Sequence, residues 1–263
     1  MDQLTQDIIE IGRRLYQKSM CASNDGNISI RLGSNRFLTT CTGGSKGFLT
    51  PEHILVMDEQ AQLVEGDNKP TSESAMHIHI YNKRPDVQAV VHAHPIMATA
   101  FATAGISLES CVLPEVAATI GTIPLTDYAT PTTEEVPAAI DRAVEHTDAF
   151  LLANHGVVTM GKDVYDAYYK MERVEHYAHI LFVARMLGGE KVLSQPQARK
   201  LLDLFGIPGP AGNATVCQPG PESEGPKAVT CDKAKGATDL KTTEPPKRTE
   251  GVEEEVQRVL RML

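Results

Sequence analysis

The sequence predicts an α/β domain, because segments with helical spacing alternate with short segments of strand character. Leucine and isoleucine side chains repeat at helical spacing over residues 3–20, which predicts an amphipathic helix. Residues 28–32 alternate apolar and polar side chains, and residues 36–40 follow after a Gly-Ser-Asn turn, so a hairpin is expected. The apolar run over residues 87–91 predicts a buried strand.

The remaining segments follow the same two periods. Helices are expected over residues 50–53, 96–104, 133–146 and 164–187, and from residue 72 onward. Strands are expected over residues 54–57, 120–125, 149–153 and 157–160, whereas residues 110–115 show no regular period. Ser72 is expected to cap the helix that follows it, because a Ser hydroxyl accepts hydrogen bonds from the free N–H groups of a first turn.

Composition and charge argue against several classes of protein. The net charge of −9 argues against nucleic acid as a partner, because phosphate contacts need clusters of Lys and Arg. Residues 1–7 are polar and acidic, unlike a signal peptide. No apolar run approaches the roughly 20 residues of a membrane span. Five scattered cysteines without a CxxC spacing predict reduced thiols, so we expect a cytoplasmic protein without a membrane partner.

Three regions differ in composition. Residues 1–206 are expected to form the folded domain, and residues 207–250, rich in Pro, Gly, Lys and Thr, a disordered, flexible linker. Residues 251–263 predict an amphipathic helix, whose apolar stripe is formed by Val252, Val256, Val259, Leu260 and Leu263. Because a helix of about 12 residues is marginal in water alone, this helix is expected to dock on a partner, or alternatively on its own domain.

Two histidines stand at the end of the strand predicted over residues 87–91. Because residues two apart on a strand point to the same side, His92 and His94 can present two ring nitrogens to one point. His155 stands at the end of another apolar run, over residues 149–153. If the two strand ends meet, the result is three neutral imidazoles with an open position, a ligand set typical of a catalytic zinc ion.

Four other histidines are open to more than one interpretation. His77 and His79 lie two apart on a predicted helix and point to different faces, so packing or surface positions are favoured over a metal site. His176 and His179 lie three apart on one helix face, near Glu172. A solvated or subunit-facing surface is again favoured over metal.

Two further features can belong to a substrate site. The glycine-rich segment over residues 42–47 can cradle a phosphate through its backbone N–H groups, although a plain turn is the more common use of such a segment. Glu73 lies in the first turn of a predicted helix. There it can complement the helix dipole, or lie near a phosphate or substrate that the helix N-terminus attracts.

Six short segments, taken together and in order, resemble the class II aldolase/adducin family across roughly residues 5–190. They are Gly26–Arg31, Thr42–Gly43, Lys46–Gly47, Thr71–Glu73, His92–Pro95 and Asn154–Gly156. The resemblance implies a three-layer α/β/α fold with a central, mostly antiparallel sheet. It also implies a homotetramer with active sites between subunits.

The resemblance implies roles for particular residues. One zinc ion per subunit would be held by His92, His94 and His155, with Glu73 as a further ligand that accepts and donates protons. The substrate phosphate would be bound by Asn27, Thr42, Gly43, Thr71 and Ser72. The implied reaction is zinc-dependent cleavage of a 6-deoxyketose 1-phosphate, such as L-fuculose or L-rhamnulose 1-phosphate, to dihydroxyacetone phosphate and lactaldehyde, with zinc as a Lewis acid.

The chain departs from the family pattern in three places. Where family aldolases have a Tyr donated by the neighbouring subunit, this chain has Leu113-Pro114-Glu115. Glu115 is therefore a candidate for the catalytic group that protonates the aldehyde oxygen. Cys41 and Ser45 stand where the family has Pro in the phosphate loop. A C-terminal Tyr that faces the substrate in the family has no counterpart, which leaves the aldehyde preference open.

Three alternatives share the scaffold. Pentulose-phosphate 4-epimerases have Asp at the position of Glu73, which favours the aldolase, whereas methylthioribulose-1-phosphate dehydratases share the zinc ligands. A non-enzymatic, adducin-like module lacks the metal-binding histidines.

The C-terminal segment, residues 251–263, has a resemblance of its own. It is similar to the encapsulation peptides of bacterial microcompartment enzymes, which are short amphipathic helices on Pro- and Gly-rich tethers. This implies shell proteins as partners and the lumen of a microcompartment as location.

Overall fold

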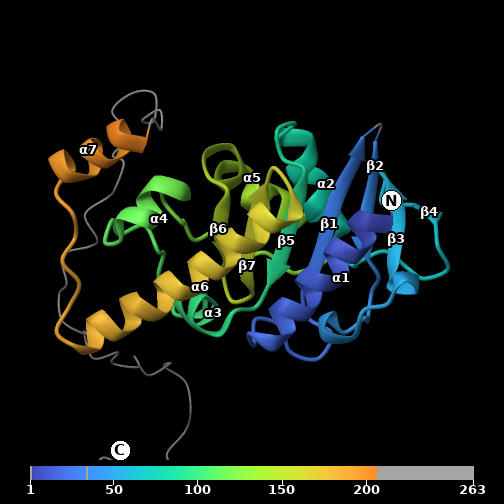
Figure 1. Ribbon diagram of the computed structural model, residues 1–263, viewed down its shortest axis with the longest axis horizontal. Coiled ribbons are helices and arrows are strands. Elements are labelled where there is room, and N and C mark those ends of the chain that lie inside the picture. The colour runs from blue at the N-terminus through green and yellow to red at the C-terminus, as the bar shows by residue number, and fades with distance from the viewer. Residues whose placement is uncertain (1, 34, 206–263) are drawn as a thin grey trace, which may run out of the picture. The chain divides into compact units, whose positions relative to one another are not determined.

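The computed structural model describes residues 2–33 and 35–205, which form one seven-stranded sheet with helices on both faces (Figure 1). The strand order is β4-β3-β2-β1-β5-β7-β6, and every neighbouring pair is antiparallel. The strands are β1 Asn27–Gly33, β2 Arg36–Thr40, β3 Ile54–Asp58, β4 Leu63–Glu65, β5 Ala89–Ala93, β6 Ala149–Leu152 and β7 Gly156–Gly161. The expectation of a mostly antiparallel central sheet is confirmed.

Helices cover the sheet in two layers. The α-helices are α1 Asp2–Gln17, α2 Ser74–Lys83, α3 Ile96–Thr103, α4 Pro114–Thr119, α5 Glu135–His146, α6 Val164–Met186 and α7 Gln195–Phe205; the 3₁₀ helices are η1 Lys46–Phe48 and η2 Pro51–His53. One apolar cluster packs α1, α3 and α6 against the sheet, and a second packs α2 and α5 against it. The three-layer arrangement implied by the family resemblance is therefore confirmed.

Strand β5 shows how one segment serves both layers. Val91 belongs to the cluster under α1, α3 and α6, whereas Val90 belongs to the cluster under α2 and α5. Successive side chains of a strand point to opposite faces, so an all-apolar strand is buried twice. All five residues of β5 are buried, which holds the histidine near its end in a fixed place.

Three predicted segments are wrong. Helix α1 ends at Gln17 rather than at residue 20, because Ser19 adopts a left-handed φ of 58° just after it. Residues 120–125 do not form a strand and make only single bridges, since Pro124 lacks the N–H group that a ladder needs. Of residues 110–115, expected to be irregular, Pro114 and Glu115 instead begin helix α4, with Pro114 at the first helical position.

The start of α2 also differs from the prediction. Ser72 lies outside the helix and is exposed, and the N-cap position belongs to Glu73, whose side chain makes no capping bond. The Glu73 carboxylate turns instead toward Asn27. Apart from α4, three elements were not predicted: the 3₁₀ helix η1, the exposed three-residue strand β4 and helix α7.

The cysteines match the prediction only in part. Cys21 and Cys41 are free and buried, whereas Cys111 is disulfide-bonded, contrary to the expectation of reduced thiols throughout. Spacing along the chain does not report distance in space, which decides whether two thiols can bond. No helix in the described part of the chain is long and apolar enough to cross a membrane. The linker predicted over 207–250 and the helix predicted over 251–263 lie outside the described residues.

Candidate active site

Three imidazoles meet where β5 and β7 lie side by side. His92 is on β5, His94 follows directly, and His155 occupies the turn between β6 and β7. The ring centroids are 4.8 to 5.0 Å apart in all three pairs, and the nearest ring nitrogens all lie within 4.8 Å of one another. The convergence predicted from two strand ends is confirmed, because the antiparallel pairing of β5 with β7 brings those ends together.

Neighbouring groups orient two of these rings. His92 donates from Nδ1 to the carbonyl oxygen of Val157 at 2.9 Å, so its Nε2 is left unprotonated and faces the cluster. The Nδ1 atom of His94 lies 3.4 Å from the carboxylate of Asp25, a group that offers only hydrogen-bond acceptors. Asp25 was predicted only as part of a turn, and nothing in its local sequence indicates this contact.

Gly156 leaves the space that the rings occupy. A Cβ atom at this position would lie 2.6 Å from the carbonyl oxygen of Ala93 and 2.6 Å from Cδ2 of His94. It would also lie 3.2 Å from Cε1 of His92. Only glycine therefore lets β7 begin this close to the end of β5.

Glu73 lies against the imidazoles from the start of α2. One carboxylate oxygen is 3.3 Å from Nε2 of His92 and the other is 3.4 Å from Nε2 of His155. Asn27, on β1, donates from Nδ2 to Glu73 Oε2 at 2.6 Å. Strand pairing explains this approach, because Asn27 lies directly opposite His92 in the register of β1 with β5.

Burial and charge set the protonation of these groups. Burial would raise the pKa of Glu73, but the facing imidazoles of His92 and His155 and the Asn27 amide lower it to about 2. Burial lowers the pKa of His92 to about 3 and lowers that of His155, although Glu73 opposes both shifts. We therefore assign an ionised carboxylate beside neutral imidazoles, which is the protonation state that metal ligands require.

The donor set fits a divalent metal ion. The Nε2 atoms of His92 and His94 lie 3.2 Å apart, close to the edge of roughly 3.4 Å that a tetrahedron with Zn–N bonds of about 2.0–2.1 Å would have. Nε2 of His92 carries no proton, so its lone pair faces Nε2 of His94 across this distance. A shared cation would use these nitrogens, and the bond from His92 to Val157 is the kind of outer hydrogen bond usual for ligating histidines.

The residues predicted to bind phosphate lie in two adjoining loops and on β1. Thr42 and Gly43 are exposed, and the Thr42 hydroxyl donates to the carbonyl oxygen of Pro70 at 2.7 Å, so their loop lies beside Thr71 and Ser72. Thr71 is buried and Ser72 exposed. The fifth residue, Asn27, is buried, with its amide already shared between Glu73 and His77.

Lys46 ties the glycine-rich loop to the turn before β1. Its side chain is only 2% exposed, and its ammonium group donates to the carbonyl oxygens of Gly44 at 2.6 Å and Asn24 at 2.9 Å. Burial lowers the pKa of Lys46. In the family resemblance this lysine is only a motif residue. In the structure it links the glycine-rich loop to the turn that precedes β1 through two hydrogen bonds.

Other candidates lie elsewhere. Glu115 is in the first turn of α4 and lines a hollow of about 420 Å³ with side chains of α6, among them Arg173 and His176. His176 and His179 are exposed. Within the described residues, only the three histidines at the strand ends form a group able to hold one ion.

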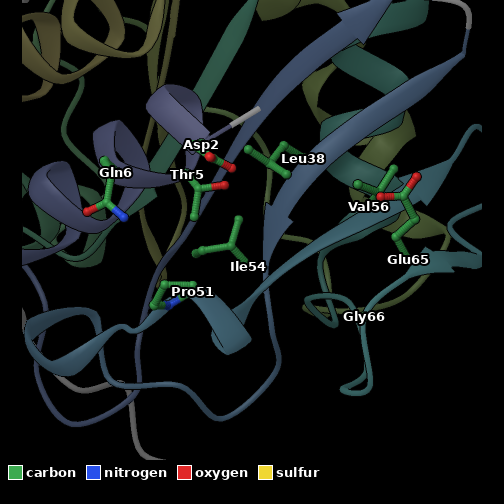
Figure 2. A pocket seen from close by; sticks show the side chains of 9 residues that line it. All are labelled: Asp2, Thr5, Gln6, Leu38, Pro51, Ile54, Val56, Glu65 and Gly66. Atoms are coloured by element: carbon green, nitrogen blue, oxygen red, sulfur yellow. The ribbon is translucent and has the colours of Figure 1, made fainter.

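A second hollow, of about 450 Å³, lies between α1 and strands β2–β4 and contains none of the predicted site residues (Figure 2).

The fold and the histidine cluster together define a family. The chain belongs to the Class II Aldolase and Adducin N-terminal domain family, whose model matches residues 6–182. Its relatives include an L-fuculose phosphate aldolase from Methanococcus maripaludis, 36% identical over 181 residues that cover 69% of this chain and 97% of the relative. A 3-oxo-tetronate 4-phosphate decarboxylase from Haemophilus influenzae is 32% identical over 189 residues, 70% of this chain and 88% of the relative.

Solved structures agree with the sequence comparisons. An L-fuculose 1-phosphate aldolase has a TM-score of 0.73 and 28% identity, covering 78% of this chain and 97% of that one. The L-fuculose-1-phosphate aldolase from Thermus thermophilus has a TM-score of 0.64 and 27% identity, covering 71% of this chain and 96% of that one. The architecture of both solved aldolases is therefore shared over nearly their whole length, and over about three quarters of this chain.

Proposed function

We propose that this protein is a zinc-dependent lyase that breaks the carbon–carbon bond between the carbons α and β to the carbonyl group of a phosphorylated keto-sugar. The preferred substrates are 6-deoxyketose 1-phosphates, L-fuculose or L-rhamnulose 1-phosphate, which would yield dihydroxyacetone phosphate and lactaldehyde. The observation that carries the proposal is the meeting of His92, His94 and His155 with the Glu73 carboxylate at one point.

Each side chain has a task in this reaction. The three imidazoles would hold the zinc ion, which when bound supplies Lewis-acid polarisation of the substrate oxygens. Glu73, ionised and held by Asn27, can accept a proton from the substrate and return one to the carbon left by the cleavage. Such general acid–base catalysis contributes about 10²–10⁴-fold in rate.

The phosphate group is proposed to bind across the two adjoining loops. The exposed Thr42, Gly43 and Ser72 offer hydroxyl and backbone N–H donors there, and Thr71 is proposed to bind the phosphate from its buried position beside Ser72. Asn27 donates one amide hydrogen to Glu73 and retains a second for the phosphate.

Decarboxylation of a 3-oxo-tetronate 4-phosphate is the second candidate. Loss of carbon dioxide from that 3-oxo acid also leaves dihydroxyacetone phosphate, so the same carboxylate and imidazoles would serve. An aldehyde forms only when the substrate's C4 hydroxyl gives up its proton to a base, whereas a carboxylate leaves as carbon dioxide without any such proton transfer. The segment Leu113-Pro114-Glu115, which lacks the Tyr of family aldolases, favours this reading, and the 32% identical decarboxylase supports it.

One assay separates the candidates. Full-length protein is incubated with L-fuculose 1-phosphate, L-rhamnulose 1-phosphate or 3-oxo-tetronate 4-phosphate, with and without chelator, and dihydroxyacetone phosphate is measured. Release from either ketose phosphate supports the aldolase, and release from the oxo acid alone supports the decarboxylase. Chelator should abolish release in each case, and zinc should restore it. Absence of release from all three would refute the proposal and leave the epimerase and dehydratase chemistries to be tested.

The proton of the aldehyde oxygen is proposed to be handled by Glu115 of a neighbouring subunit in a homotetramer: its carboxylate accepts the C4 hydroxyl proton during cleavage and returns it to the aldehyde oxygen in the reverse, condensation direction. Within one chain, Glu115 lines the α4–α6 hollow. The family resemblance, in which this segment reaches a neighbouring site, supports the assignment.

Residues 251–263 are proposed to anchor the enzyme to shell proteins of a bacterial microcompartment. The support is the sequence pattern alone, a single apolar stripe after a Pro- and Gly-rich stretch. Deleting residues 251–263 should abolish co-purification with shell proteins and leave catalysis intact, whereas unchanged co-purification would contradict the assignment.

A further inference from the structure

His77 lies at the centre of a buried hydrogen-bond chain. Its side chain is fully buried on α2, and both ring nitrogens have partners. Nε2 lies 2.5 Å from Asn27 Oδ1 and Nδ1 lies 2.6 Å from Ser29 Oγ. Ser29 Oγ lies 2.8 Å from the Tyr81 hydroxyl. With the bond from Asn27 to the Glu73 carboxylate, the chain runs unbroken from Tyr81 to Glu73.

The negative charge of Glu73 sets the direction of every bond in this chain. A carboxylate only accepts hydrogen bonds, so Asn27 must turn its NH₂ group toward Glu73 and its oxygen toward His77. That oxygen needs a donor, which places the His77 proton on Nε2 and leaves Nδ1 to accept from Ser29. Ser29 can then accept from Tyr81. Burial lowers the pKa of His77 to about 4, so the neutral ring with this one tautomer satisfies all the groups.

The spacing of the residues matches the two elements that carry them. Glu73, His77 and Tyr81 recur every four residues at the start of α2 and along it, which places them on one helix face. Asn27 and Ser29 lie two apart on β1 and share one strand face. Any buried imidazole needs partners for its nitrogens, but here the partner of Nε2 is the same Asn27 amide that donates to Glu73, which links His77 to the site.

We infer that His77 is a positioning residue, which holds the Asn27 amide in the orientation that donates to Glu73 and so fixes the carboxylate against the imidazoles. The inference rests on the proposed function and extends it. Without the Nε2 donor, the Asn27 amide can turn over and bring its oxygen against the carboxylate. Glu73 would then leave its place beside His92 and His155.

Two substitutions separate positioning from packing. His77→Gln keeps an NH₂ donor at similar reach, whereas His77→Leu fills similar space without one. His77→Leu should lower kcat for dihydroxyacetone phosphate release by about 10–100-fold, the usual cost of losing an outer partner of a metal-site residue. KM should change little, and His77→Gln should recover most of the loss. Wild-type kcat in His77→Leu, or equal losses in both variants, would overturn the inference.

His79 supplies a matched control on the same helix. Its Nε2 atom lies 2.9 Å from the carboxylate of Asp141, away from the chain of bonds. His79→Leu and His79→Gln should leave kcat and KM unchanged. Zinc content of every variant is measured by mass spectrometry, and kcat per bound zinc is compared. If the kcat of His77→Leu equals that of the wild type when both are expressed per bound zinc, His77 acts on zinc content and the positioning role is contradicted.

A second readout needs no turnover. In zinc-loaded, full-length protein with ¹⁵N-labelled histidine, the His77 ring should carry its proton on Nε2 at pH 7, with Nδ1 bare. The signal is assigned by its absence from His77→Gln. A proton on Nδ1, or a mixture of tautomers, would overturn the inference. If no substrate is turned over, the proposed function fails, while this measurement still judges the orientation of Asn27.

Discussion

At the scale of single residues, the site depends on groups that would never touch the metal. Gly156 leaves room for the rings of His94 and His92, and Asp25 faces Nδ1 of His94. The three histidines could be predicted because their strands are visible as apolar runs. Asp25 could not, since its contact with His94 depends on where the turn before β1 lies relative to the end of β5.

Gly156→Ala should weaken zinc binding. The added methyl group would meet the Ala93 backbone oxygen and the His94 ring, both at 2.6 Å, so backbone or ring must move. We expect a loss of affinity of at least about tenfold, as for other changes that misplace a ligand, measured by competition with a chelating dye.

Gly105→Ala is the control for this prediction. Gly105 has a φ of 72° but open space around its Cβ position, so alanine there adds backbone strain of about 1–2 kcal/mol without touching the imidazoles. Its zinc affinity should equal that of the wild type. Equal losses in both variants would show that general destabilisation, rather than the contact with His94, is responsible.

At the scale of elements, α2 and β1 together build the acid–base part of the site. The four-residue spacing of Glu73, His77 and Tyr81 is visible in the sequence, yet the sequence alone favours a packing or surface position for His77. It is buried, but as a hydrogen-bonded group rather than as filler. The spacing acquires its meaning only when α2 is known to lie against Asn27 and Ser29.

Lys46→Met should loosen the phosphate loop without affecting the imidazoles. The substitution leaves the carbonyl oxygens of Gly44 and Asn24 without their donor. We expect the free energy of unfolding to fall by about 1–3 kcal/mol, the usual cost of unpaired buried groups, and KM for the phosphorylated substrate to rise. Urea unfolding and steady-state kinetics measure the two effects. Lys69→Met, an exposed change in the adjoining loop, should change neither the free energy of unfolding nor KM. A Lys46→Met protein with wild-type stability and KM would contradict the proposed role of Lys46 in linking the two loops.

His77 should make the metal-free protein sensitive to acid. Its pKa is about 4 in the folded state and about 6.5 unfolded, so the unfolded state binds the extra proton first as pH falls. The contribution of His77 to the free energy of unfolding is therefore fully present above about pH 6.5 and is lost as the pH falls toward 4. Between pH 7 and 5 the loss from His77 amounts to about 2 kcal/mol. Urea unfolding at both pH values should show a correspondingly smaller loss in His77→Gln, and an identical loss in the two proteins would exclude this group as the cause.

At the scale of the whole molecule, one sheet gathers the site from distant parts of the chain. β1 pairs with β5 and β5 with β7, so residues near 27, 92 and 155 become neighbours. Glu115, by contrast, lines a hollow between α4 and α6. If it acts in catalysis as proposed, it must do so on the site of another subunit.

Mixed tetramers test this arrangement. Glu73→Gln and Glu115→Gln homotetramers should each be nearly inactive as aldolases. If each site takes Glu73 from one subunit and Glu115 from another, equal co-assembly of the two variants restores about a quarter of the sites. Activity of the mixture at that level, with tetramers verified by light scattering, supports the shared site. No recovery in verified mixed tetramers, or full activity of Glu115→Gln alone, would contradict the role of Glu115.

The α/β class, most helices and strands, and the three imidazoles could be predicted from local properties, namely periodicity and the residues at strand ends. The fold was needed to show that Glu73 lies against His92 and His155 and that His77 is linked to it through Asn27. It also decided that residues 120–125 make single bridges and residues 114–119 a helix. Those outcomes depend on which strands pair and which helix covers them, and such contacts join residues far apart in the chain.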